Sequence, residues 1–459
     1  MKTKSRSKAQ PGPAVLERIA EGKALRSLLP RSAHGAWAPP PGRADPIKVL
    51  ELSSQGRIPE LVPIRYGRMM ESAFTFMRGS PSVMARDLAL QTPVTGLRVQ
   101  ASGDCHLENF GVFATPERNL IFDINDFDET LPAPWEWDVK RLATSFYVVG
   151  RTKNFSETTC ADAAGAAVAG YRTRMAACAG MSTLEIWYSR IDAKSLVGEL
   201  QKAQLSRTSL DPNRAAPDHT HEMVANHFTQ GTGEERRFIE QSPTISHLPE
   251  DNDLVQDGRK VLKRYHSSLR DDLAHLFARY HLIDLAMKVV GLGSVGTRCV
   301  VALFNALGDD PLILQIKEAK ESILEPYAGK SSYKTHGERI VAGQFLMQAA
   351  SDIFLGWTTS EDAHQYYVRQ LADMKASLSI KSMNLRDLGT YASLCGEVLA
   401  IAHARSGDPQ MISGYLGSST TFDKALTRFA ARYADQITSD YELFVRSVRS
   451  GRLPAVQDV

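Results

Sequence analysis

Cysteine is scarce in this chain, and long hydrophobic runs are missing. The five cysteines are widely scattered and none belongs to a Cys-x-x-Cys pair, which argues against a disulfide framework and against a structural zinc site. The apolar stretches are far shorter than the roughly 20 residues that a membrane-crossing helix needs. The first residues combine charge with proline and lack the apolar core of a signal peptide. We therefore expect a cytoplasmic protein that does not interact with a membrane.

The composition is that of a globular protein with one unusual segment at its start. The 459 residues are 43% hydrophobic and 23% charged, which allows two or three domain-sized cores. The net charge is +2, yet residues 1–45 hold nine Lys and Arg against three Asp and Glu. This segment is rich in proline, and its single aromatic residue is Trp37. We expect residues 1–44 to form a disordered basic tail, and we do not expect nucleic acid as a partner.

Apolar periodicity divides the remainder of the chain. Helical spacing dominates residues 45–280, except at 206–252, where prolines, glycines and polar residues predict a long loop or insertion. Residues 281–375 change to the two-residue period of strands, and residues 376–459 return to helix. The sequence thus predicts an α+β protein with a helical large lobe, a small lobe built on an antiparallel sheet, and C-terminal helices that pack on the large lobe.

Two acidic segments in the helical part suit phosphoryl transfer. A short strand ends at Asp104, and Asn109 follows five residues later. Such an Asp-x-x-x-x-Asn loop supplies a carboxylate for the attacking hydroxyl and an amide oxygen for Mg²⁺. A second apolar strand brings three more carboxylates, 14 to 19 residues beyond Asn109: Asp123, Asp126 and Asp128. We expect one of these to complete the metal site, and we favour Asp126.

A glycine loop and a lysine follow in the strand-rich part. The segment Gly291-Leu-Gly293-Ser294-Val-Gly296 lies between two runs of β-branched residues, and Lys317 lies in the next apolar strand. A dinucleotide-binding fold requires a helix directly after such glycines, whereas a kinase-type phosphate flap requires a second strand. Strand-like sequence follows here. The alternative of an NAD(P)-binding oxidoreductase keeps one supporting feature, because Asp309 and Asp310 lie about 20 residues past the glycines, where a ribose-binding acid is expected.

The same segments carry a resemblance at two levels. The motifs GDCHLENFG, FDINDFDE, WEWDVKRLATS, KVVGLGSVGTR, LQIKEA, QAASDIFLGW and YYVRQLADMK resemble the bacterial domain-of-unknown-function family 2252 from about residue 45 onward. More remotely, they are similar to the protein-kinase-like superfamily, closest to its aminoglycoside and choline phosphotransferase branch. The superfamily resemblance implies ATP and Mg²⁺ as cofactors. It also implies a small-molecule acceptor, because the short span from Asp126 to Asp138 leaves no room for a long activation segment.

The superfamily resemblance also implies roles for particular residues. Asp104 and His106 would be catalytic, and Asp138 would hold the catalytic loop by accepting backbone N–H bonds. Lys317 needs an acidic partner, for which Glu338 on a following helix is favoured and Glu325 is the reserve. The residues expected to bind nucleotide are Gly291, Gly293, Ser294, Gly296, Lys317, Gln370 and Leu371.

The order of the segments departs from that superfamily, because the glycine loop comes almost 190 residues after Asp104. Circular permutation accounts for this, since the termini of a compact domain often lie close enough to be joined. We therefore expect a circularly permuted, protein-kinase-like two-lobe fold. The alternative is a coincidental glycine loop, with residues 1–150 forming an incomplete kinase-like fragment.

The predicted function is an ATP-dependent phosphotransferase that moves the γ-phosphate to a hydroxyl of a small molecule. Two alternatives use the same nucleotide site. A nucleotidyl transferase would leave AMP on the acceptor, and a non-catalytic interaction module would only bind the nucleotide. The identity of the acceptor and the oligomeric state stay open at this point.

Overall fold

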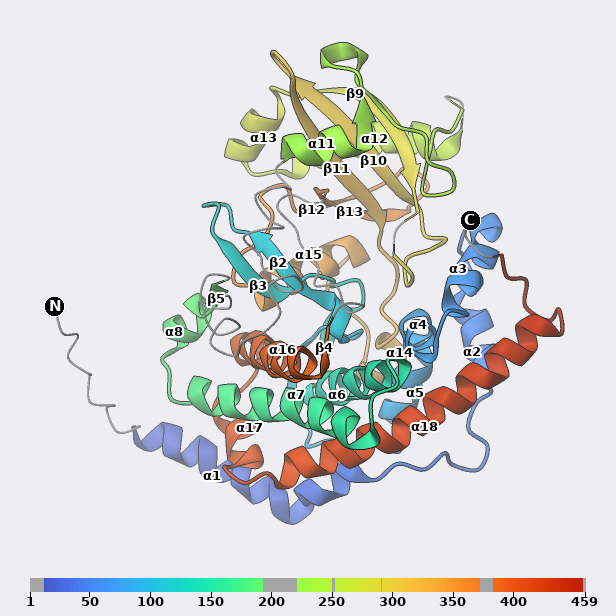
Figure 1. The fold of residues 1–459 in the computed structure, drawn as a ribbon. Coiled ribbons are helices and arrows are strands. Elements are labelled where there is room, and N and C mark those ends of the chain that lie inside the picture. Colours follow the sequence, from blue (N-terminus) through green and yellow to red (C-terminus); the bar gives the residue numbers. More distant parts are fainter. Residues whose placement is uncertain (1–11, 193–220, 250–251, 290, 372–382, 457–459) are drawn as a thin grey trace.

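The computed structural model describes residues 12–192, 221–249, 252–289, 291–371 and 383–456, which form a mixed α+β protein with more helix than strand. A lobe with a β-sheet stacks on a larger, mainly helical lobe (Figure 1). In the described part of the chain, none of the helices has both the length and the apolar character needed to cross a membrane.

The large lobe is built from both ends of the chain. Its helices are α1 (Pro13–Leu28), α2 (Pro46–Ser53), α3 (Val62–Met69), α4 (Ala73–Gly79), α5 (Pro81–Gln91), α6 (Trp135–Thr152), α7 (Glu157–Cys178), α8 (Thr183–Tyr188), α16 (Leu385–Ser406), α17 (Pro409–Leu416) and α18 (Thr421–Arg449). Its strands are β1 (Arg98–Ala101), β2 (Phe110–Ala114), β3 (Leu120–Ile124), β4 (Leu131–Pro134) and β5 (Ile191–Asp192). Strand β1 pairs with β4, and β3 lies between β2 and β5.

Helices α6, α7 and α16 form the centre of this lobe. The alanine-rich α7 packs closely on α16 because glycine stands at the crossing: a methyl group at Gly396 would lie 2.0 Å from the carbonyl oxygen of Ala167. Helix α6 is buried over almost its whole length. It therefore gives a rigid base to the polar side chains that it directs toward β1.

The small lobe carries the main sheet. Its helices are α11 (His221–Phe228), α12 (Asp253–Ser268), α13 (Asp271–Phe277) and α15 (His336–Met347). Its strands are β6 (Thr229–Gln230), β7 (Arg237–Phe238), β8 (Ile245–Ser246), β9 (His281–Lys288), β10 (Cys299–Ala306), β11 (Asp310–Glu318), β12 (Gly356–Thr359) and β13 (Gln365–Gln370). The short helix α14 (Glu325–Ala328) comes between β11 and α15 in the chain but packs against β4 of the large lobe (Figure 1).

The main sheet is antiparallel in the order β12-β13-β11-β10-β9-β8. Successive side chains of β10 alternate between its faces. Val300 and Ala302 pack in the apolar cluster with α12, whereas Val301 and Leu303 pack in the cluster with α11. Helices therefore cover both faces of the sheet. The predicted order of strand, glycine loop, strand, turn and strand is confirmed by β9, β10 and β11.

The N-terminal segment differs from the prediction of a disordered tail over residues 1–44. Residues 13–28 form α1, which packs on α17, and the 3-10 helix Arg31–Gly35 packs on α18. Basic side chains hold this segment on the large lobe. Arg26 Nε donates to the carbonyl of Tyr415 at 2.9 Å, and Arg31 donates to the carbonyl of Leu416. These cations bind the free carbonyls at the C-terminal end of α17. Residues 1–11 lie outside the described residues.

The predicted insertion at 206–252 also differs from the structure. Residues 206–220 lie outside the described residues, but 221–249 form α11 and the short strands β6, β7 and β8. Helix α12 packs on the small-lobe sheet through Val261 and Tyr265, whereas its helical period predicts a place in the large lobe. Among the described residues, the small lobe thus begins at residue 221 and not at 281. Two-residue strands are too short to produce a detectable alternation, which explains why the sequence reads as a loop there.

Candidate functional site

The loop that carries Asp104 follows β1 and is held by hydrogen bonds to a side chain of helix α6. Asp138 accepts hydrogen bonds from the backbone N–H groups of Ser102 at 2.6 Å and Gly103 at 3.0 Å. His403 Nε2 lies 3.2 Å from the same carboxylate. Gly103 has a φ of +83°, and a methyl group there would lie 2.6 Å from the carbonyl oxygen of Glu129. The turn before Asp104 therefore depends on a glycine and on the Asp138 carboxylate.

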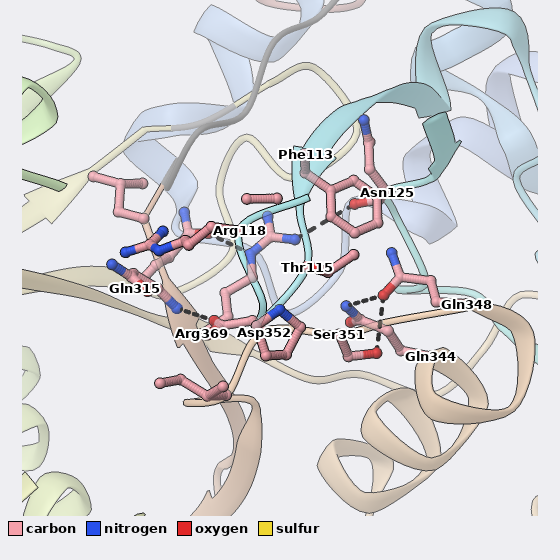
Figure 2. Close-up of a pocket in the computed structure, with 15 residues that line it drawn as sticks. Phe113, Thr115, Arg118, Asn125, Gln315, Gln344, Gln348, Ser351, Asp352 and Arg369 are labelled. Atoms are coloured by element: carbon pink, nitrogen blue, oxygen red, sulfur yellow. Dashed lines mark hydrogen bonds between the residues drawn. The ribbon is translucent and has the colours of Figure 1, made fainter. Parts of the chain in front are cut away.

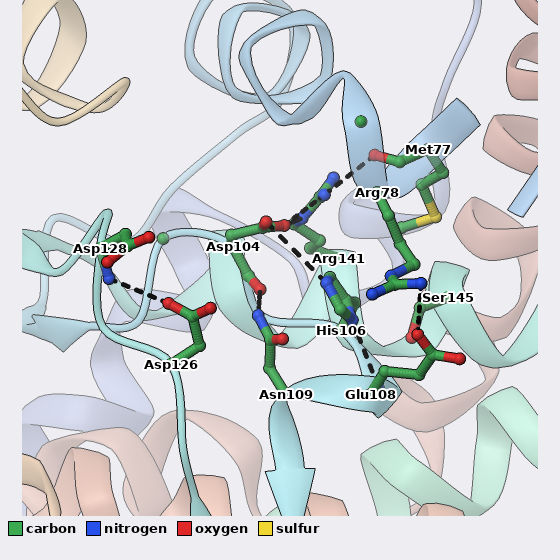
Figure 3. A network of polar contacts seen from close by, with 12 residues as sticks. Met77, Arg78, Asp104, His106, Glu108, Asn109, Asp126, Asp128, Arg141 and Ser145 are labelled. Carbon is green, nitrogen blue, oxygen red and sulfur yellow. Dashed lines mark hydrogen bonds and ion pairs between the residues drawn. The ribbon is translucent and has the colours of Figure 1, made fainter. Parts of the chain in front are cut away.

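The carboxylate of Asp104 is fixed by an arginine that sequence reasoning missed. Arg141 Nε donates to Asp104 Oδ1 at 2.7 Å, and Arg141 is almost fully buried (Figure 3). Arg141 lies three residues after Asp138, so both side chains project from one face of α6. This spacing of three residues is the feature of the sequence that could have identified Arg141 as part of the site. Burial raises the pKa of Asp104, although the Arg141 charge opposes the shift.

His106 lies beside Asp104 as a neutral ring. Its Nδ1 accepts a hydrogen bond from the backbone N–H of Glu108 at 3.2 Å, and its Nε2 lies 3.9 Å from Asp104 Oδ2. Burial, followed by the charges of Arg78 and Arg141, lowers the pKa of His106 well below its usual value. His106 can orient Asp104 but is poorly suited to carry a proton.

Asn109 and Asp126 line one cavity with Asp104. The Asn109 side-chain nitrogen donates to the Asp104 carbonyl at 2.9 Å, so its amide oxygen is the end left for a cation. The backbone N–H of Asn125 donates to the Asn109 carbonyl at 3.0 Å, which joins the two acidic loops. Within the described ranges, no group of three or more His, Cys, Asp or Glu side chains is arranged to hold a metal ion. Because Mg²⁺ usually takes one or two protein oxygens together with phosphates and water, Asn109 and Asp126 still fit it.

The other two carboxylates have different partners. Asp123 accepts from the backbone N–H groups of Ile124 at 2.9 Å and Ala349 at 3.1 Å, is buried, and does not line the cavity. The prediction of Asp123 as a metal ligand is therefore wrong, and its carboxylate has a structural role. Asp128 lines the cavity and accepts from the Tyr367 hydroxyl at 2.7 Å.

Asp128 is also the acidic partner of Lys317, with which it forms an ion pair. The predicted partners, Glu338 and Glu325, do not contact Lys317. Glu338 accepts from the backbone N–H of Lys334 at 3.2 Å, and Glu325 lies 3.9 Å from Arg339 Nε. Both assignments are corrected because α15 turns Arg339 toward the site.

Arg339 joins α15 to the backbone of the loop that carries Asp126 and Asp128. Its guanidinium donates to the carbonyls of Thr130 at 2.6 Å, Asp128 at 2.9 Å and Lys320 at 2.8 Å. The face of α15 nearest the site thus carries a cation. The acidic partner of Lys317 is Asp128, which comes from the loop after β3.

The glycine loop covers the same cavity, which measures about 250 Å³ and is lined by Gly291, Gly293 and Ser294. Ser294 Oγ lies 3.3 Å from Asp128 Oδ2. Gly296 has a φ of +87° and packs on the Arg57 side chain outside the cavity lining. Strand β10 begins at Cys299, and no helix follows the glycines. The hairpin prediction is confirmed, and the geometry of a dinucleotide fold is not formed.

A second cavity of about 330 Å³ lies between the lobes (Figure 2). Gln370 and Leu371 line this cavity and not the one under the glycine loop. Asn125 lines it as well, and the next residue, Asp126, lines the first cavity. Gln315, two residues before Lys317, is also part of its wall. Strand β11, which carries Lys317, thus contributes Gln315 to the second cavity and Glu318 to the first, and the loop of Asn125 and Asp126 contributes to both.

Four cations of the first cavity were not predicted: Arg57, Arg65, Arg78 and Lys320. Of these, Arg78 forms an ion pair with Glu108 at 2.5 Å. Arg57 and Arg65 come from the segment around α2 and α3, more than 200 residues before the glycine loop. No local pattern connects them to it, because arginine on an amphipathic helix is an ordinary surface residue.

The structure thus defines a two-lobed α+β protein whose acidic loops meet a glycine loop at one cleft. The model of the family described as "Uncharacterized protein conserved in bacteria (DUF2252)" matches residues 57–447, and the chain belongs to this family. No curated protein and no solved structure matches the chain.

Proposed function

We propose that this protein is an ATP-dependent phosphotransferase with a permuted kinase-like fold, which moves the γ-phosphate to a hydroxyl of a small molecule. The observation that carries the proposal is the ion pair between Lys317 and Asp128, which are 189 residues apart and come from different lobes. Phosphoryl transfer needs a lysine, a metal-binding carboxylate and a base within reach of one triphosphate. This pair puts the lysine strand beside the loops that carry Asp104 and Asp126.

The cleft offers a proton acceptor with one oxygen already engaged. Arg141 occupies Oδ1 of Asp104, so Oδ2 takes the proton of the acceptor hydroxyl. The hydroxyl oxygen bonds to the γ-phosphorus while the bond from that phosphorus to the β–γ bridging oxygen breaks, and ADP leaves. Asn109 and Asp126 would hold Mg²⁺, which when bound neutralises charge on the phosphates.

Lys317 is suited to hold phosphate. Its ammonium lies against Asp128 in the protein alone, and this carboxylate raises the pKa of Lys317, so the side chain stays charged. A triphosphate in the cavity would replace part of that contact. Ser294 and the glycines would cover the phosphates, because a loop without bulky side chains brings its backbone N–H groups close to them.

The second cavity is the place that we propose for the base and ribose of ATP. Its wall combines the Phe113 ring with the side-chain amides of Asn125, Gln315 and Gln370, and such groups stack on a purine or bond to its edge. Because the loop of Asn125 and Asp126 and strand β11 line both cavities, one nucleotide could extend from one cavity to the other.

Labelled ATP tests the proposal. The purified full-length chain is incubated with Mg²⁺, a mixture of small hydroxyl compounds, and ATP labelled at either the γ- or the α-phosphate. Transfer of γ-label, abolished in Asp104→Asn, supports phosphotransfer. Transfer of α-label means nucleotidyl transfer and contradicts the proposal, as does ATP binding without any transfer.

Binding is measured separately from turnover. Mg²⁺ and ATP should raise the melting temperature by mass action, and Asp126→Asn should remove most of this shift. Asp362→Asn, which changes an exposed carboxylate of the small lobe, is the matched control and should keep it. If ATP produces no shift in the unaltered protein, the proposal fails.

A further inference from the structure

A cationic cluster in the wall of the first cavity has no role in the transfer step described above. It consists of Arg57 in the turn after α2, Arg65 in α3, and Lys320 just beyond β11, and all three line the cavity with Asp104. Three separate segments of the fold thus direct positive charge to one place.

The hydrogen-bond partners of this cationic cluster are neutral oxygens. Arg57 donates to the carbonyls of Ser53 at 3.2 Å and Val295 at 2.6 Å. Arg65 donates to the Ser54 hydroxyl at 2.9 Å and to a backbone carbonyl. Lys320 donates to the Gly56 carbonyl at 2.6 Å. None of these bonds compensates the positive charge.

Direct ion pairs between the cluster and the carboxylates of the cavity are few among the described residues. Arg57 and Arg65 form no ion pair with any residue in the described part of the chain. The nearest acid to Lys320 is Glu318, at 3.8 Å, and this acid also pairs with Arg298 at 3.2 Å. Asp128 is engaged by Lys317. Glu129 also lines the cavity; it accepts a hydrogen bond from the backbone N–H of Ile323 at 2.8 Å, and its charge acts on Arg57 without forming an ion pair with it.

Holding these charges together costs free energy. Arg65 is 1% exposed, and its Nε is buried without a hydrogen-bond partner among the described residues. Burial lowers the pKa of Arg65, and the Arg57 charge lowers it further. Burial also lowers the pKa of Lys320; the Glu318 charge opposes this shift, and the nearby arginines add to it. A buried cation without a counter-ion is expensive, and an anion that binds there would remove the cost.

We propose that Arg57, Arg65 and Lys320 bind a phosphate group, at a site distinct from the Lys317–Asp128 pair. This inference rests on the proposed function, because the cluster shares its cavity with Asp104. The phosphate could be carried by the acceptor, which would then be a phosphorylated hydroxyl compound, or it could belong to the nucleotide.

Two hydroxyl groups favour the acceptor as the source. Ser82 and Ser102 line the cavity, and their buried Oγ atoms have no hydrogen-bond partner among the described residues. Such groups can bond to the hydroxyls of a sugar or polyol. A phosphorylated polyol would place its phosphate at the cluster and one hydroxyl at Asp104.

Inorganic phosphate is the probe for the site. Its affinity for the full-length chain is measured by calorimetry without nucleotide, against chloride at equal ionic strength. Arg57→Gln and Lys320→Gln should each weaken phosphate binding by about tenfold or more, as expected for a lost charge-assisted hydrogen bond. Lys263→Gln, which removes an exposed lysine of α12, should leave it unchanged. Arg65 is left intact because it is buried.

A second titration, at saturating Mg²⁺ and a non-hydrolysable ATP analogue, separates the two sources. Phosphate binding that persists assigns the site to the acceptor, and binding that disappears assigns it to the nucleotide; both results support a phosphate site. The proposal is overturned if phosphate binds no better than chloride, or if both variants bind it as the unaltered protein does. Because the first titration contains no ATP, its result does not depend on whether the chain is a phosphotransferase.

Discussion

Lys317 on strand β11 and Asp128 in the loop after β3 form an ion pair across the cleft. Lys317 is 3% exposed, and the Tyr367 hydroxyl donates to the second Asp128 oxygen at 2.7 Å. Each charge therefore has its partner in the opposite lobe. Because little water reaches the lysine, removal of one partner leaves the other poorly solvated.

Asp128→Asn should lower the free energy of unfolding by about 2–3 kcal/mol. This is a small loss for a broken buried ion pair, because the Asp128 side chain is 26% exposed. The double variant Asp128→Asn/Lys317→Met should recover much of this loss, since the buried ammonium is gone. Urea unfolding measures both effects.

The exposed pair of Lys260 and Glu361, at 2.8 Å, is the control. Glu361→Gln should cost less than about 1 kcal/mol. If Asp128→Asn costs no more than this control, the pair across the cleft does not join the lobes energetically.

Asp104→Asn should reduce turnover by at least about 100-fold, the scale expected when a positioned general base is lost. The affinity for Mg²⁺ and ATP should change little, because Asn109 and Asp126 are intact. Steady-state kinetics and calorimetry on the same preparation separate the two effects. An equal loss of ATP affinity would make Asp104 a binding or structural residue.

Arg141→Gln should move the acid limb of the pH–rate profile to higher pH. The Arg141 charge holds down the pKa of Asp104 against the effect of burial, so its removal raises that pKa further. Asp104 must be ionised to accept a proton, and activity would then fall at a higher pH as the solution is acidified. Arg141→Lys keeps a positive charge and should shift the limb less. An unchanged limb with lower turnover would show that Arg141 only supports the fold.

Short sequence patterns predicted the parts of the cleft that single loops and strands form. The glycines at 291–296 are followed by β10 because β-branched residues continue on both sides. The loops around Asp104 and Asp126 end short apolar strands, which places both at the mouth of the cleft. The sheet and its alternation were also predictable, since a two-residue period identifies strands directly.

Contacts between distant segments could not be predicted in this way. Glu338 was favoured as the lysine partner because of its spacing, but spacing does not say which face of α15 turns toward the site, and Arg339 takes that face. The N-terminal helix was missed for a similar reason. In the sequence, the basic residues near the end of this helix are typical of a solvated tail. In the fold, Arg26 donates to carbonyls at the end of α17, and the sequence does not show that this helix end lies beside it.

His34 links the N-terminal segment to the stability of the whole large lobe. It is fully buried, and its Nε2 lies 2.7 Å from the Tyr415 hydroxyl. Burial, with a smaller contribution from the Lys140 charge, lowers the pKa of His34 to about 3. The folded protein therefore keeps this ring neutral at pH values where the unfolded chain protonates it.

The unaltered protein should accordingly lose stability as the pH falls from about 6.5 toward 3, by up to about 1.4 kcal/mol per pH unit from this group. The sign follows because the unfolded chain binds the extra proton throughout that range. His34→Gln, which can still donate to Tyr415, should remove this contribution, so that its unfolding free energy falls less steeply between pH 6.5 and 4.5. His275→Gln, at an exposed position of α13, is the control and should follow the unaltered protein. Urea unfolding at several pH values measures the slopes, and identical slopes for His34→Gln and the unaltered chain would mean that the ring of His34 is protonated in the folded protein.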